Sequence, residues 1–369
     1  MTGRERVRKA LDHETTDRIP IAMVCSGINE PTRSEVDAYL KETRGTSLAS
    51  FLHETIDITG VGPDYIGPPL ADEEDHWGVR RKPVQQALGE YDEIYAYPLR
   101  EAESLEDIEK HRWPNPDWFD YSVIPGKIER VLRERDRAIM ASNGNIFETS
   151  WYMRGMDTLM MDFVLNPDIA HAIAERVTAF YLEYFDRILD AGQGEFDLVF
   201  TADDLGGQQG LLISRAMWEE FIKPYHVRLN EVIHRHNAKV IYHSDGAVSE
   251  VVDGLVDMGI DVLQALQFDA AGMDPEDLKS RFGSSGGGGD AGGGGPSGGG
   301  LCFEGGVSVQ HTLPHLTPDD VRTEVKHLIS TLGRDGGYVL GPSHAIQAGT
   351  PVENIMAMFD TALEFYPFG

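Results

Sequence analysis

Short apolar runs alternate with longer segments that carry apolar residues at helical spacing. Several of the short runs are apolar throughout, as expected for strands that are covered on both faces of a parallel sheet. The predicted strands are residues 18–24, 137–142, 197–203, 239–245, 261–267, 301–309 and 337–344. Regular alternation of such strands with helices is the pattern of an α/β fold.

The longer segments predict amphipathic helices. They are residues 122–135, 168–192, 214–236, 249–259, 274–282 and 317–333. Ser249 and Thr317 are placed to act as N-caps, and Pro318 suits the first helical position. The helices predicted at 249–259 and 317–333 each end near a glycine, as helices often do.

We expect a single (β/α)8 TIM barrel over residues 1–369, preceded by a helical N-terminal extension. The open doubly wound sheet is disfavoured, because no G-x-G-x-x-G follows the first strand. An eighth strand should lie within residues 51–100 or arise from splitting one run. Residues 284–300 are nearly pure glycine and serine, and we expect a flexible surface loop there.

The charge balance limits the classes of partner. The chain has 61 acidic and 32 basic residues, a formal net charge of −29. Such a surface repels nucleic acid and anionic lipid. Cys25 and Cys302 are too few for a disulfide framework, and no window approaches the ~18 apolar residues of a membrane helix. We expect a soluble cytoplasmic protein; a homodimer is compatible with the sequence.

Polar residues gather at the ends of the predicted strands. In an α/β barrel these ends meet at one mouth, where catalytic groups lie. The residues at the strand ends are Cys25, Ser26, Asn143, Asn145, Glu148, Asp203, Asp204, His243, Asp245, Gln264, Gln267, Glu304, Ser343 and His344. Of these we expect Asn143, Gln264 and Gln267 to contact the substrate.

Three residues of this ring form a candidate metal site. His243 and Asp245 lie two apart, so both side chains can face the barrel axis, and His344 ends another strand. Two imidazoles and a carboxylate are a common ligand set for a catalytic divalent metal, zinc especially. The alternative is that His243 and Asp245 only hydrogen-bond backbone groups.

The other candidate residues each have two interpretations. One carboxylate of Asp203 and Asp204 could cap the following turn. The other could anchor the substrate or act as a general acid or base, as could Glu148. Trp151, Tyr152 and Arg154 could form a pocket wall with one cationic side chain, or a packed aromatic pair with a surface arginine.

Several stretches together resemble the uroporphyrinogen decarboxylase-like superfamily. They are RERVRKALDHETTDRIPI, DDLG, HSDG, GGVSVQHTLP and GPSHAIQAGTPVENI. The resemblance covers residues 4 to about 365, except for the glycine-rich loop. It implies a (β/α)8 barrel whose site lies at the C-terminal mouth.

One branch of this superfamily contains cobalamin-dependent methyltransferases. Its thiol-methylating members hold zinc on an H-x-C pair and a distant cysteine, and the matching positions here are His243, Asp245 and His344. Oxygen and nitrogen ligands in place of thiolates leave a metal more Lewis acidic and suit an oxygen-bound substrate. We therefore expect methyl transfer from a small O-methyl ether or alcohol to a corrinoid carried on a separate protein.

The other branch contains cofactor-free decarboxylases. A decarboxylase of uroporphyrinogen or another carboxylic acid needs cationic groups at the mouth, from Arg33, Arg154, or Arg80 and Arg81. A mouth ringed by carboxylates repels such a substrate. A third alternative is a binding module that keeps the barrel without catalysis.

Overall fold

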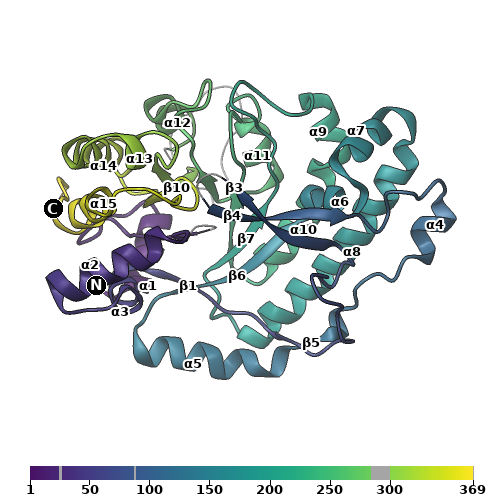
Figure 1. Cartoon of the computed structure of the whole chain (residues 1–369), viewed down its shortest axis with the longest axis horizontal. Helices are drawn as coiled ribbons and strands as arrows, with labels where there is room; N and C mark the ends of the chain where they lie inside the picture. The colour runs from purple at the N-terminus through teal and green to yellow at the C-terminus, as the bar shows by residue number, and fades with distance from the viewer. Residues whose placement is uncertain (25–26, 87–88, 284–299, 369) are drawn as a thin grey trace.

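The computed structural model describes residues 1–24, 27–86, 89–283 and 300–368 (Figure 1). Within these ranges, seven parallel strands form one curled sheet in the order β1-β6-β7-β8-β9-β10-β11. Its strands are β1 (Ile58–Gly60), β6 (Ala138–Asn145), β7 (Leu198–Ala202), β8 (Lys239–His243), β9 (Val262–Ala265), β10 (Cys302–Val307) and β11 (Tyr338–Pro342). The predicted α/β class and parallel sheet are confirmed.

Helices surround the curled sheet in Figure 1. They are α1 (Gly3–Leu11), α2 (Thr32–Arg44), α3 (Leu48–Thr55), α4 (Leu105–Lys110), α5 (Ile124–Glu134), α6 (Ile146–Arg154), α7 (Met156–Leu165), α8 (Pro167–Gly192), α9 (Arg215–Phe221), α10 (Lys223–Arg235), α11 (Val252–Met258), α12 (Pro275–Phe282), α13 (Thr312–His315), α14 (Pro318–Leu332) and α15 (Val352–Glu364). Two small antiparallel sheets pair β2 (Asp64–Tyr65) with β5 (Phe119–Asp120) and β3 (Arg80–Gln86) with β4 (Gly89–Ala96). None of the described helices is long and apolar enough to cross a membrane.

The helix predictions hold with two corrections. The segment 214–236 forms α9 and α10 rather than one helix, because Pro224 has no N–H to donate and crowds the preceding turn. Ser249 does not cap α11, which begins at Val252 after Val251 without a side-chain cap. Thr317 does cap α14, in a capping box with Asp320.

The sheet does not close into the predicted eight-stranded barrel: within the described residues it has seven strands, and the segment 18–24, predicted as a strand, contributes only an isolated bridge. Ile21 makes a single parallel bridge to Leu340 of β11, and its carbonyl accepts a 2.8 Å bond from the N–H of Asp57, just before β1. Pro20 has no N–H, so the ladder cannot extend. The additional strand expected within 51–100 is β1. The described part of the loop predicted at 284–300 is Gly300 alone; the rest lies outside the described residues.

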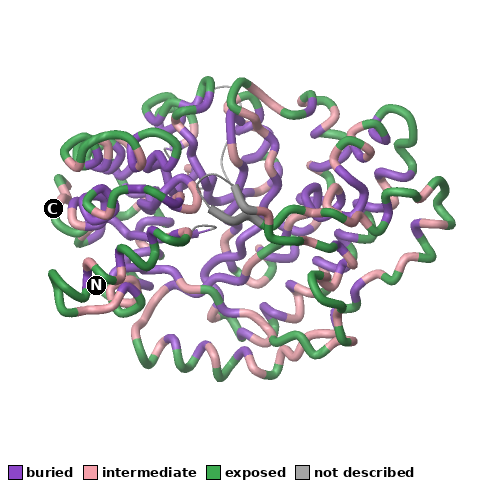
Figure 2. The backbone as a smooth tube through the Cα atoms, viewed as in Figure 1, coloured by how far each residue is buried: buried purple, intermediate pink, exposed green. Residues whose placement is uncertain are grey.

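Two apolar clusters hold the fold together. The larger lies between the sheet and the helices, and a smaller one fills the inside of the curl. Successive residues of a strand contribute to opposite clusters: Val240 and Tyr242 to the outer, Ile241 to the inner. Val7 and Leu11 of α1 join the inner cluster, so the predicted N-terminal helix is part of the core. In Figure 2 the strands of the seven-stranded sheet are mostly buried, and the outward faces of the helices are exposed.

Three buried aspartates tie neighbouring strands together where the strands begin. Each strand-start aspartate accepts the backbone N–H of the neighbouring strand or segment: Asp57 from Ile21 at 3.0 Å, Asp197 from Ile139 at 2.8 Å and Asp261 from Val240 at 2.7 Å. All three are at most 8% exposed. Buried carboxylates of this kind need cationic or N–H partners.

Asp57 has the largest set of cationic partners among the strand-start aspartates. Its carboxylate lies 3.0 Å from Arg6 Nη1 of α1 and 2.8 Å from Arg18 Nη1. One fully buried side chain thereby joins α1, the segment around Ile21 and the start of β1.

We predict that Asp57→Ala lowers the free energy of unfolding by about 3–5 kcal/mol, because Arg6 Nη1, Arg18 and the Ile21 N–H together lose a fully buried acceptor, although Arg6 keeps its pair with Asp17. Chemical denaturation of the purified variant measures this loss. The matched control is Glu129→Ala in α5, which removes an exposed pair with Arg133 and should cost about 0.5 kcal/mol or less. Equal losses in the two variants would contradict a structural role for Asp57.

Candidate functional site

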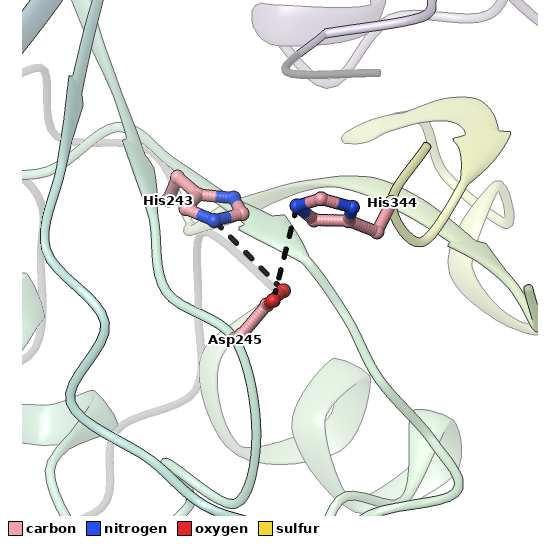
Figure 3. A group of neighbouring side chains, drawn as sticks. All are labelled: His243, Asp245 and His344. Atoms are coloured by element: carbon pink, nitrogen blue, oxygen red, sulfur yellow. Dashed lines mark ion pairs between the residues drawn. The ribbon is translucent and has the colours of Figure 1, made fainter. Parts of the chain in front are cut away.

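His243, Asp245 and His344 come together at the carboxyl ends of two strands. His243 is the last residue of β8, Asp245 follows it by two positions, and His344 lies two residues beyond β11. Asp245 Oδ1 is 3.8 Å from His243 Nε2, and its Oδ2 is 3.9 Å from His344 Nε2. Figure 3 shows the carboxylate between the two rings. One ligand atom of each residue lies within 4.8 Å of the others.

Gln264 of β9 sets the orientation of the His243 ring. Gln264 Oε1 accepts a hydrogen bond from His243 Nδ1, while Gln264 Nε2 donates to the Val24 carbonyl at 3.1 Å. The register pairs His243 with Gln264 across β8 and β9. With Nδ1 occupied, His243 presents Nε2 toward the neighbouring carboxylates.

Charge concentrates around His243, which is 4% exposed. Burial acts to lower the pKa of His243, but Asp204 and then Asp245 raise it to about 9. Asp204 Oδ1 lies 3.4 Å from His243 Nε2. Burial also acts to raise the pKa of Asp204, yet His243 lowers it overall. Two carboxylates therefore share one imidazole.

Asp245 is left with unmet bonding capacity. Burial raises its pKa, although the charge of His243 opposes this effect. Its Oδ1 is buried and has no hydrogen-bond partner among the described residues. A buried carboxylate oxygen without a donor is costly unless a cation binds there.

Asp203 has a structural role, which corrects its prediction as a catalytic candidate. It is fully buried and accepts the backbone N–H groups of Phe147 and Glu148 at 2.9 and 2.8 Å. His226 Nε2 lies 2.6 Å from the same carboxylate. Asp203 thus satisfies the first turn of α6, rather than the turn that follows it in sequence.

Glu148 lies in the first turn of α6 and is 7% exposed. It accepts hydrogen bonds from Asn145 Nδ2 at 2.6 Å and from the Tyr152 hydroxyl at 3.0 Å. Burial, followed by the charges of Asp204 and Asp203, raises the pKa of Glu148 to about 8. This shift favours the protonated form of the carboxyl group at neutral pH.

Tyr152, Asn143 and Gln267, all predicted to contact the substrate, lie in different surroundings. Tyr152 contacts Glu148, and the Arg81 guanidinium lies 5.0 Å from its ring centre. Asn143 is exposed in a left-handed conformation, where the β6 ladder shifts register. Gln267 accepts the Gly246 N–H at 2.9 Å and so supports the turn that carries Asp245.

Arg154 is not available to a substrate, which corrects that prediction. It is 4% exposed, and its Nε pairs with Asp162 at 2.7 Å. Its Nη1 donates to the carbonyls of Leu99, Arg100 and Ala102. The guanidinium therefore ties α6 to the segment before α4.

A cavity of about 510 Å³ opens beside Asp245 and His344. Its lining residues are Asp245, Gln267, Val309, Gln310, Pro314, His315, His344, Gln347, Ala348 and Gly349. None of these described residues is a lysine or an arginine. The sequence patterns missed Gln310 and Gln347, because residues in loops after strands show no periodicity.

Comparisons with known proteins agree on the family. A family model described as "Uroporphyrinogen decarboxylase (URO-D)" matches residues 93–365. The uroporphyrinogen decarboxylase of Geotalea daltonii is 22% identical over 275 residues, which are 72% of this chain and 71% of that protein. That of an Anaeromyxobacter species is 23% identical over 272 residues, 70% and 68% of the two chains. A methyltransferase from Methanosarcina mazei shares the fold, with a TM-score of 0.67, 18% identity and 99% of each chain covered.

The two neighbouring aspartates should respond differently to substitution. We predict that Asp203→Ala lowers the free energy of unfolding by about 3 kcal/mol, because two backbone N–H groups and His226 lose a buried acceptor. Asp204→Ala should cost about 1 kcal/mol or less, since Asp204 is half-buried. Chemical denaturation checks both, and a larger loss for Asp204→Ala would contradict this assignment.

Proposed function

We propose that this chain, which belongs to the uroporphyrinogen decarboxylase (URO-D) family, is a methyltransferase. It would take a methyl group from a small O-methyl ether or alcohol and pass it to a reduced corrinoid. His243, Asp245 and His344 would hold a divalent metal, zinc by preference. The likeness in fold to a methyltransferase supports the choice of this reaction within the family.

The observation that carries the proposal is the donor set at the strand ends. Two imidazoles and one carboxylate converge within 4.8 Å, and Asp245 Oδ1 is buried without a hydrogen-bond partner among the described residues. Three protein ligands with an open position are typical of catalytic zinc. A metal bound there supplies Lewis acidity toward the oxygen of the substrate.

Glu148 is suited to supply the proton. In methyl transfer the O–C bond breaks with its electron pair staying on oxygen, and the methyl group bonds to the corrinoid. The oxygen then takes up a proton and leaves as water when methanol is the donor, or as an alcohol or phenol when an ether is the donor. The raised pKa of Glu148 favours its protonated form, and its hydrogen bonds from Asn145 and Tyr152 fix its position.

The cavity beside the site favours a substrate without acidic groups. Its described lining offers carboxamides, histidines and apolar surface but no lysine or arginine. A carboxylate there would lie unpaired beside Asp245, which is unfavourable. The methyl acceptor in this proposal is a corrinoid carried on a separate protein.

The second candidate is decarboxylation of uroporphyrinogen, which the names of the curated relatives favour. That substrate needs cations at the mouth. Arg154 is buried and fully occupied, and Arg80 and Arg81 pair with Glu74 and Asp75. Arg33 lines a different cavity, beside α3. These placements favour methyl transfer.

Metal analysis tests the donor set directly. We predict about one zinc ion per chain in protein purified with zinc, and loss of most of it in His344→Ala, because three ligands are needed to retain the ion. Elemental analysis of dialysed protein gives the ratio. His315→Ala is the matched control, since His315 lines the same cavity outside the donor set. No zinc in wild type, or equal zinc in both variants, would contradict the site.

Turnover tests the role of Glu148. We predict that the zinc-loaded protein transfers methyl groups from methanol or 2-methoxyphenol to cob(I)alamin. Glu148→Gln should slow this about 10²- to 10⁴-fold while zinc content stays unchanged, because the amide cannot give up a proton. Absorbance of the corrinoid follows the reaction.

The same preparation should be assayed with uroporphyrinogen, where we expect no carbon dioxide release. Decarboxylation without methyl transfer would overturn the proposal in favour of the second candidate. Neither reaction, with small-molecule affinity retained, would point to a binding module.

A further inference from the structure

The end of β9 has an unusual backbone. Ala265 and Leu266 both have positive φ, 94° and 53°, although neither is a glycine. Such conformations are strained and persist where the surroundings enforce them. The strained pair separates Gln264 from Gln267, whose amides reach His243 and the turn that carries Asp245.

Gln264 is fully buried and its amide can face only one way. The Val24 carbonyl accepts and cannot donate, so the amide nitrogen must face Val24. The amide oxygen therefore faces His243 Nδ1. Because an amide oxygen can only accept, Nδ1 must carry the proton that it donates.

Glu304 lies next to Gln264 across the β9–β10 ladder. It is fully buried, and neither carboxyl oxygen has a well-aligned hydrogen-bond partner among the described residues. Burial raises the pKa of Glu304 to about 8, against the lowering effect of the Gln264 amide. Gly341 makes room for this side chain, since a Cβ there would lie 2.8 Å from Glu304 Oε1. Gln264 thus rests against a neutral neighbour.

We propose that Gln264 is a positioning residue that keeps the Nδ1 proton of His243 in place, so that Nε2 is the metal ligand. This inference rests on the metal site of the proposed function, and it moves Gln264 from the predicted substrate contacts to the support of the metal site. Histidines that bind metals usually donate their other N–H to an acceptor, and loss of that acceptor weakens binding.

The test is the zinc affinity of Gln264→Met, measured by competition with a chromogenic chelator. Methionine keeps the length of the side chain but removes the oxygen that faces Nδ1. We expect affinity to fall about 10- to 100-fold. Gln264→Glu keeps an oxygen acceptor and should bind zinc more tightly than Gln264→Met does.

A matched control separates this role from general stability. Asn230→Leu removes a buried amide in α10 that donates to the Met258 carbonyl. It should lower the unfolding temperature without changing zinc affinity. Unchanged affinity in Gln264→Met, or equal weakening in both Gln264 variants and in Asn230→Leu, would overturn the inference.

The nitrogen to which zinc binds can also be determined on the wild-type protein, so this test does not depend on a variant that folds. Nitrogen-15 spectra of the zinc-loaded protein should show His243 with a proton on Nδ1 and zinc on Nε2. Zinc on Nδ1 would overturn the role of Gln264 while leaving the proposed function standing. Absence of zinc from the wild type would instead remove the metal site, and this inference with it.

Discussion

The geometry of the mouth depends on the register of the parallel sheet, which buried carboxylates hold at the opposite end. Asp57, Asp197 and Asp261 each start a strand and accept an N–H from its neighbour. A slip by one residue would turn every side chain to the other face. The observed register places Ala202 beside His243 and His243 beside Gln264. Hydrogen bonds from backbone N–H groups to these carboxylates thereby help to fix which polar groups meet at the strand ends.

At the mouth, the adjacent carboxylates of Asp203 and Asp204 have different tasks because the first is fully buried and the second is half-buried. Asp203 satisfies the first turn of α6 and so places Glu148, while Asp204 approaches His243. Burial, and then the charges of these aspartates, raise the pKa of Glu148 and favour its neutral form. One cation among several acidic groups leaves the site short of positive charge. That shortage is the physical reason for expecting a metal, and it disfavours an acidic substrate.

Family membership alone leaves the reaction open, since the relatives are named decarboxylases and a protein of the same fold is named a methyltransferase. The side chains around the mouth distinguish the two chemistries. Of the arginines that a porphyrinogen could use, Arg80, Arg81 and Arg154 are engaged in structural pairs, while the donor set suits a Lewis acid. The strained end of β9 is consistent with a site whose supporting residues are held at some cost in stability.

The sequence by itself determined the alternation of strands and helices, the cap at Thr317 and the placing of His243, Asp245 and His344 at strand ends. These features depend on local periodicity or on neighbours a few residues away. Only the tertiary structure decided that Arg154 is enclosed, that Asp203 caps a helix more than fifty residues before it, and that Gln264 faces a histidine. Those roles come from partners distant in the chain. No periodicity records which of two adjacent polar side chains will be buried once the strands and helices have packed.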